Sequence, residues 1–476
     1  KFNWRELLQD LGNYKKESIL GPLFKLLEAS FELIVPLVMA AIIDTGVANA
    51  DRPYIMKMSL VLFLLALIGL TCAITAQYFA AKAAVGCATG LRHALFEHIE
   101  TLSFTEMDTV GTSTLITRMT SDVNQVQNGV NLVLRLFLRS PFIVFGAMVM
   151  AFTIDVKAAL VFVVTIPLLS VVVFGIMLVS IPLYKKVQAA LDKVLGITRE
   201  NLTGSRVIRA FNKEQDEIAQ FHEDNEALTK IQLYVGKISA LMNPLTYIII
   251  NGAIVVLVWV GAIRVDNGNI TQGQVVALVS YMSQILVELI KLANLIININ
   301  KSIACMNRIE TVLDMESSIT EHPAAETGSL TSDGAGREGK ETIPAENAVV
   351  FSKVGLTYAG ASEEALSDID FTVRRGETIG IIGGTGSGKS SVVNLIPRFY
   401  DATRGEVLVD GKNVRDYTLE ELRAKVGVVL QKAVLFKGTI RENLSWGNSD
   451  ATDEEMYEAL ETAQAREFVD AKEGGL

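Results

Sequence analysis

Long charge-free runs of apolar residues recur through about the first two thirds of the sequence. Four such runs cover residues 59–81, 158–184, 238–263 and 270–287, and charged residues bound each of them. A bilayer core about 30 Å thick needs about 20 apolar residues in a helix that rises about 1.5 Å per residue. Each run is therefore predicted to cross a membrane as a helix.

Two further hydrophobic runs, residues 20–47 and 132–154, contain charged residues and bring the predicted number of spans to six. A charge inside a span costs about 2.5–3.5 kcal/mol on insertion scales, so it needs a partner or a function. One interpretation is a charged lining of a substrate cavity. The other is ion pairing between helices, with snorkelling at the inner interface. Counting along the helices places Arg135 and Glu288 at similar depth. The charged residues in the two runs are Lys25, Glu28, Glu32, Arg135 and Arg139, and Glu288 and Lys291 lie in the sixth span.

The connections between spans differ in length and charge. Those after the second and fourth spans are long and basic, so the positive-inside rule places them, and both termini, in the cytoplasm. Helical periodicity continues through residues 191–207 and 214–235, which predicts helices that extend past the membrane surface as stalks. The basic residues are Lys82, Arg92 and Arg118 in one connection and Lys185, Lys186, Lys193, Arg199, Arg206, Arg209 and Lys213 in the other.

Two segments flank this six-span domain, which we place at residues 20–316. Residues 1–19 mix aromatic and leucine side chains with charges, which predicts an amphipathic helix on the inner membrane surface. Residues 317–345 contain mostly Glu, Ser, Gly, Thr, Pro and Ala, the composition of a solvated linker. The linker separates the membrane domain from a soluble domain at residues 346–476.

Short apolar runs of strand length alternate with helical segments in the soluble domain. A glycine-rich loop follows the third predicted strand and opens a helix, a strand–loop–helix unit typical of an α/β domain. The predicted strands are residues 348–358, 368–373, 378–382, 407–410 and 426–430, and the predicted helices are 390–399 and 452–469.

The glycine-rich loop carries the chemistry. It fits the pattern G-x-x-x-x-G-K-[ST] at every fixed position, between a predicted strand and a predicted helix. Glycines let successive backbone N–H groups face bound phosphates in conformations that a Cβ would forbid. Lys389 would supply positive charge to the phosphates, and the Ser390 hydroxyl would bind Mg²⁺ beside the helix N-terminus. The predicted phosphate-binding residues are Gly383, Gly384, Thr385, Gly386, Ser387, Gly388, Lys389, Ser390 and Ser391.

Composition and charge exclude several classes of protein and of partner. The chain has 476 residues, with 50% hydrophobic and 20% charged residues and a mean hydropathy of +0.35, which excludes an ordinary cytosolic globule and a disordered chain. Residues 1–316 hold 26 basic and 26 acidic residues, so the whole net charge of −10 lies in the soluble part. That acidic balance argues against nucleic acid as a partner. Cys72, Cys87 and Cys305 are widely spaced, which favours buried thiols, and no metal-ligand spacing occurs.

Nearly the whole chain resembles the ATP-binding cassette exporters, specifically half-transporters with six membrane helices and one nucleotide-binding domain. The matching segments in the soluble part are residues 351–358, the phosphate-binding loop, residues 405–411 and residues 428–436. By position, the resemblance implies that Tyr358 stacks on adenine and that Gln431 reaches Mg²⁺ and couples the site to the membrane helices. It also implies that the turns near residues 105–116 and 205–214 act as coupling helices.

The resemblance further implies groups that this sequence does not contain. The family would place a signature Ser-Gly-Gly-Gln segment, a second strand ending in Asp-Glu and a switch histidine after Leu476. No catalytic residue for ATP hydrolysis is therefore named, and we expect the sequence to be part of a longer chain, with an incomplete nucleotide-binding domain. Lys432 stands where many members carry Asp or Glu, which loosens assignment to a subfamily.

The resemblance implies that two chains pair, with ATP and Mg²⁺ as cofactors, and drive export of a drug, lipid or peptide across the cytoplasmic membrane. We favour a heterodimer with a second half-transporter over a homodimer, with membrane lipid and a hydrophobic or amphipathic substrate as further partners. One alternative is an ATP-binding regulatory subunit without productive hydrolysis. An importer is disfavoured, because importers usually keep membrane and nucleotide domains on separate chains.

Overall fold

The protein divides into two compact units. The computed structural model describes residues 12, 14–320, 346–472 and 474–476. Most of the predicted amphipathic helix at 1–19 and most of the predicted linker at 317–345 lie outside these residues. The first unit comprises Lys1–Leu102 and Glu106–Ser318, and the second comprises Ser103–Thr105 and Ile319–Leu476.

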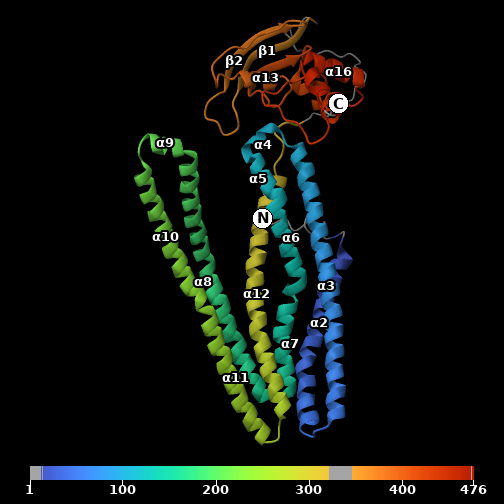
Figure 1. Ribbon diagram of the computed structural model, residues 1–476, viewed down its shortest axis with the longest axis vertical. Coiled ribbons are helices and arrows are strands. Elements are labelled where there is room, and N and C mark those ends of the chain that lie inside the picture. Colours follow the sequence, from blue (N-terminus) through green and yellow to red (C-terminus); the bar gives the residue numbers. More distant parts are fainter. Residues whose placement is uncertain (1–11, 13, 321–345, 473) are drawn as a thin grey trace, which may run out of the picture. The chain divides into compact units, whose positions relative to one another are not determined.

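The first unit is a bundle of long helices (Figure 1). Among the described residues, six segments are long and apolar enough to cross a membrane, which confirms the predicted number of spans. In the same part of the chain, three π-helical segments interrupt the regular helices. In chain order the elements are α2 (Lys15–Ala41), η1 (Ile42–Val47), α3 (Arg52–Thr101), α4 (Phe104–Val110), α5 (Thr112–Thr117), η2 (Arg118–Asp122), α6 (Val123–Leu132), η3 (Val133–Phe137), α7 (Arg139–Ile154), α8 (Val156–Thr203), α9 (Ser205–Ala210), α10 (Glu214–Ala240), α11 (Met242–Asp266) and α12 (Gln272–Leu313).

Several helices are much longer than a membrane requires. Helix α3 has 50 residues and α8 has 48, which correspond to about 70–75 Å of helix against a bilayer core of about 30 Å. The excess length forms the predicted stalks, and the short helix α9 joins the ends of α8 and α10 (Figure 1).

Side-chain caps fix where these helices begin at the opposite end of the bundle. Asp51 caps α3, and the Asp155 carboxylate accepts a hydrogen bond of 2.8 Å from the Ala158 N–H at the start of α8. Thr271 and Gln274 form a capping box at the start of α12. Each cap satisfies backbone N–H groups that have no partner inside the helix.

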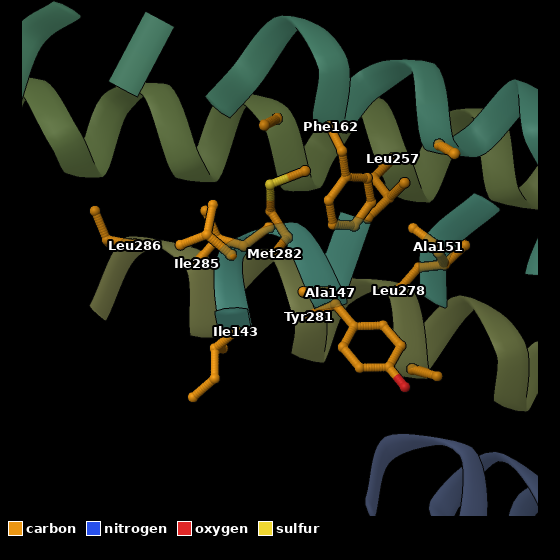
Figure 2. Packing of buried hydrophobic residues seen from close by; sticks show 14 of the residues in the cluster. Ile143, Ala147, Ala151, Phe162, Leu257, Leu278, Tyr281, Met282, Ile285 and Leu286 are labelled. Atoms are coloured by element: carbon orange, nitrogen blue, oxygen red, sulfur yellow. The ribbon is translucent and has the colours of Figure 1, made fainter. Parts of the chain in front are cut away.

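The largest core of the first unit lies between helices of different spans. Phe162 of α8 and Leu257 of α11 pack beside Met282 of α12, as Figure 2 shows. Tyr281 is fully buried and donates a hydrogen bond of 2.5 Å to the Leu33 carbonyl of α2. A buried phenol needs such a partner, because an unpaired hydroxyl in an apolar core is costly.

Charged side chains inside the spans form ion pairs between helices. Arg139 of α7 binds Glu288 of α12 at 2.8 Å and Glu32 of α2 at 2.6 Å, and Lys291 also binds Glu288 at 2.9 Å. The side chains of Arg139 and Glu288 are only 8% and 2% exposed. Arg135, which the sequence places at the depth of Glu288, does not pair with it, whereas Arg139, four residues further along the chain, does. Helix rise gives depth but not the direction in which a side chain leaves the helix.

In its described residues the second unit contains an antiparallel sheet of four strands in the order β2-β1-β3-β4, where β1 is Asn347–Leu356, β2 is Leu366–Arg374, β3 is Arg404–Val409 and β4 is Lys412–Asn413. Phe351 on β1 lies opposite Phe371 on β2 and Val407 on β3, and the two phenylalanine rings stack with centroids 4.6 Å apart. One helix, α13 (Lys389–Leu395), lies between β2 and β3 in the described sequence. After β4 come the 3₁₀ helix η4 (Val414–Asp416) and the helices α14 (Leu419–Lys425), α15 (Ile440–Leu444), α16 (Asp453–Thr462) and α17 (Arg466–Asp470).

Two predicted strands, residues 378–382 and 426–430, do not form. Both segments are irregular, and most of their apolar side chains are exposed, with Ile382 at 98% and Val429 at 99%, although Val426 is half-buried. A buried strand requires hydrogen-bonding neighbours, and no described segment pairs with either run. The predicted helix at 390–399 is also shorter than expected and ends at Leu395, shortly before Pro397.

Candidate nucleotide-binding site

The glycine-rich loop runs directly into α13. Gly386 and Gly388 have φ angles of +84° and +85°, in the left-handed region that favours glycine. A Cβ at Gly388 would lie 2.6 Å from Leu366 Cδ2 and 3.1 Å from the Ala365 carbonyl oxygen. The sequence therefore folds the loop in a conformation that larger residues would strain, as the phosphate-binding interpretation requires.

Lys389 bends back over this loop. Its ammonium group donates hydrogen bonds to the carbonyl oxygens of Gly383, at 2.9 Å, and Gly384, at 2.6 Å, and to the Ser387 hydroxyl at 3.3 Å. The loop thereby holds a positive charge beside its own backbone. A polyphosphate is the ligand class that complements one fixed cation and a run of small, exposed residues.

Tyr358 is connected to the same site from the sheet. It follows β1, and its hydroxyl lies 2.8 Å from the Ser391 hydroxyl in α13. Its ring is half-buried and meets Tyr400 edge-on, with centroids 5.1 Å apart. The structure thus brings the predicted base-stacking residue next to the predicted phosphate loop. Nothing in the sequence pattern had singled out Tyr400, although it is an aromatic residue in the segment that follows α13.

Ser390 and Gln431 are not brought into hydrogen-bond contact with each other. Both are exposed, and Gln431 lies in the irregular segment that follows α14. Thr385 is also exposed at the tip of the loop. Within the described parts of the chain, no hydrogen bond involves the Gln431 side chain. The structure therefore connects Tyr358 to the helix that follows the loop, through Ser391, but does not connect Gln431, the second predicted metal ligand, to Ser390.

Comparisons with known proteins match both units. The family model described as the ABC transporter transmembrane region matches residues 18–289, and the model described as ABC transporter matches residues 366–474. The chain belongs to the ATP-binding cassette (ABC) transporter family. The first match covers more than half of the chain, and the second contains the loop and Lys389.

Individual relatives resemble this ABC transporter over most of its length. An uncharacterized ABC transporter ATP-binding protein of Mycobacterium tuberculosis (strain ATCC 25618 / H37Rv) is 34% identical over 97% of this chain and 78% of its own. A Bacillus subtilis (strain 168) protein, provisionally named for multidrug export, is 31% identical over 98% of this chain and 79% of its own. The ATP-dependent lipid A-core flippase of Desulfotalea psychrophila (strain LSv54 / DSM 12343) is 30% identical over 80% and 64%.

Membership in the family gives the two units their general roles. The chain is a multi-pass membrane protein that fuses the membrane region and the ATP-binding region of a half-transporter. Its second unit is the ATP-binding part of an ABC-type transporter ATPase. The loop geometry at Gly383, Gly388 and Lys389 is consistent with that role, because it combines a confined backbone with one exposed cation.

Proposed function

We propose that this ABC transporter uses ATP to export a hydrophobic or amphipathic substrate across the cytoplasmic membrane, as one half of a dimer. The observation that carries the proposal is the fusion of six membrane-crossing segments with a loop that folds Lys389 over its glycine carbonyls. The names of two relatives support the substrate class, since one names multidrug export and the other a lipid A-core flippase.

In this proposal the loop residues from Gly383 to Ser391 hold the ATP phosphates. The Lys389 ammonium, which now binds two carbonyl oxygens, would turn to the phosphates, since a charged acceptor forms the stronger hydrogen bond. Tyr358 would stack on the adenine base, and its hydrogen bond to Ser391 fixes the ring beside the helix that follows the loop.

Ser390 and Gln431 would supply oxygen ligands for Mg²⁺. Both side chains are exposed, and neither has a hydrogen-bond partner within the described parts of the chain. Hydroxyl and amide oxygens suit this ion, which usually keeps several of its waters and binds substrate phosphates. Bound Mg²⁺ would neutralise phosphate charge. The chain itself would contribute the Ser390 hydroxyl oxygen and the Gln431 amide oxygen as ligands.

The arrangement of the membrane unit within the cell follows from its basic connections. We place the stalks, both termini and the nucleotide-binding unit in the cytoplasm, because Lys and Arg concentrate in the long connections. The turns near residues 105–116 and 205–214 stand at the stalk ends in the sequence. We assign them the transmission of ATP-driven movement to the spans.

The experiment is ATP-dependent uptake of a lipophilic fluorescent dye into proteoliposomes that contain the full-length protein. The proposal expects uptake by the wild type and none by Lys389→Ala. Because a heterodimer is favoured over a homodimer, the protein is tested alone and after co-purification with its co-expressed half-transporter. ATP binding without hydrolysis in either preparation would instead support the regulatory-subunit alternative. Uptake that persists in Lys389→Ala would contradict ATP-driven export through this site.

A further inference from the structure

Arg135 differs from the other charged residues inside the spans. Lys25 pairs with Glu28 at 2.5 Å, and Arg139 joins Glu32 and Glu288, which also binds Lys291. Arg135 has neither an ion pair nor a hydrogen bond with any described residue. A guanidinium that stays charged in an apolar span is costly without a partner, so its position calls for a ligand or a lipid contact.

The local structure around Arg135 is irregular. It lies at the centre of the π-helical segment η3, which packs against α2 and α12. Its side chain is half-buried. Arg135 precedes the helix break at Asp155 by about 30 Å of helix, which is about the thickness of the bilayer core. In the orientation proposed above, this count places Arg135 near the headgroups of the inner leaflet. Single π-helical turns frequently occur at functional sites.

Buried polar atoms without a hydrogen-bond partner occur one turn before and one turn after Arg135, and also on α12, which packs against η3. Asn131 Oδ1, one turn before Arg135, is buried without a hydrogen-bond partner, and so is Arg139 Nε, one turn after it. Gln284 Oε1 on α12, whose amide nitrogen binds Glu32 at 3.1 Å, is also unpartnered. The Arg139 side chain is more than nine-tenths buried. Buried polar atoms without a protein partner usually bind water or a ligand.

The charge of this group of residues is also unbalanced. Four cations face three carboxylates, so the group carries one net positive charge at neutral pH. Each of the other cations is within ion-pair distance of a carboxylate, which leaves the excess on Arg135. A ligand with a single negative charge would neutralise it. The residues counted are Lys25, Arg135, Arg139 and Lys291 against Glu28, Glu32 and Glu288.

We propose that Arg135 binds the acidic headgroup of an amphipathic ligand that enters from the inner leaflet. The headgroup is a carboxylate or a phosphodiester with one negative charge, and the planar guanidinium can bind either with two parallel hydrogen bonds. The acyl chain remains in the apolar region that the spans already provide. This inference rests on the proposed function and narrows its substrate class from amphipathic to acidic amphipathic. The ligand is either a transported molecule or a resident anionic lipid, and the experiment separates the two.

The test measures binding of dansyl-labelled undecanoic acid and its uncharged methyl ester to the full-length protein in phosphatidylcholine nanodiscs. Wild type is expected to bind the acid more tightly than the ester. Arg135→Gln should weaken binding of the acid by about tenfold or more and change binding of the ester by less than about twofold. Arg135→Lys keeps the charge but cannot form the two parallel hydrogen bonds, so it should recover only part of the preference. Lys301→Gln removes the same charge from an exposed site on α12 and serves as the matched control.

Phosphatidylglycerol added to the nanodiscs distinguishes the two sources. Competition with the acid probe, together with phosphatidylglycerol retained by wild type and lost from Arg135→Gln in native mass spectrometry, assigns the site to a resident lipid. If added phosphatidylglycerol does not weaken binding of the acid, and the acid stimulates ATP hydrolysis, the site is assigned to a transported molecule. Equal affinity of wild type for acid and ester, or an unchanged preference in Arg135→Gln, overturns the inference. ATP-dependent dye uptake, measured in parallel, shows whether the proposed function itself has failed.

Discussion

Charge serves different purposes in the two units. In the membrane unit, Arg139 and Glu288 are buried and hold α2, α7 and α12 together. In the nucleotide-binding unit, the Lys389 side chain at the start of α13 donates only to the glycine-rich loop that precedes it. A buried pair is costly to break because one charge remains unpaired, whereas a surface lysine contributes little to stability. Loss of Arg139 or Glu288 should therefore affect folding, and loss of Lys389 should affect chemistry.

The largest effect is expected for Arg139→Gln. The substitution leaves Glu288 with Lys291 and the Ser140 hydroxyl, and Glu32 with Gln284, so the free energy of unfolding should fall by about 3–5 kcal/mol. Thermal unfolding of the purified protein in nanodiscs measures it. Lys291→Gln is the matched control, because its side chain is 45% exposed and its loss should cost much less. Equal losses in the two variants would show that burial does not decide the energetics.

Lys389→Ala should produce the next largest effect, on activity and not on stability. Loss of one preorganised cation at developing phosphate charge lowers turnover by about 10²–10³-fold. Steady-state ATP hydrolysis measures this, with Lys432→Ala as a control for an exposed lysine of the same unit. A large shift in the unfolding temperature of Lys389→Ala would count against the division of roles between the two units.

The pair of Asp155 and Arg264 offers a pH test in the membrane unit, at a point outside the spans themselves. Burial alone would raise the Asp155 pKa, but hydrogen bonds from Arg264 and from the Ala158 N–H outweigh it and hold the pKa below its ordinary value of 3.8. The folded state then gains stability from the ionised carboxylate above that value and loses it as the pH falls further. Asp155→Asn should cost about 1–3 kcal/mol at neutral pH.

Unfolding temperatures of wild type and Asp155→Asn, followed from neutral to acidic pH, measure this contribution. The gap between the two proteins should close as the pH falls below about 4. A gap that stays constant over the whole range would mean that ionisation of Asp155 does not stabilise the fold.

The smallest expected effect concerns the loop itself. Gly388→Ala places a Cβ at φ +85° and 2.6 Å from Leu366 Cδ2, so the second unit should lose about 1–2 kcal/mol of stability. Gly384→Ala is the control, because no atom lies within 4 Å of its added Cβ. Denaturant unfolding without nucleotide compares them. If both variants are equally stable, the loop conformation imposes no strain on an alanine at 388.

The membrane unit was predictable because its signal is local. Twenty or more apolar residues in a row define a span whatever its neighbours are, so all six were found from the sequence. The sequence did not show which charged residues pair between helices. Arg135 and Arg139 are four residues apart, and counting residues along the axis could not show that Arg139 is the one that meets Glu288. The π-helical turn at η3 changes the direction of the side chains that follow it.

The nucleotide-binding unit was predictable in its loop and less so in its sheet. The glycine pattern fixes backbone conformation locally, and the φ angles of Gly386 and Gly388 agree with it. The strands predicted at 378–382 and 426–430 depend on neighbours instead, because a strand forms only where another segment pairs with it. Neither run has such a partner among the described residues, which also leaves Gln431 in an irregular segment.

Equilibrium ATP binding to the full-length protein shows whether the glycine-rich loop with Lys389 is the ATP site. A fluorescent ATP analogue is titrated into wild type, Lys389→Ala and Lys432→Ala, with thermal unfolding of each variant to establish that it is folded. We expect wild type and Lys432→Ala to bind with similar affinity and Lys389→Ala to bind at least about tenfold more weakly. Unchanged affinity in a folded Lys389→Ala protein would contradict the assignment of the loop as the ATP site.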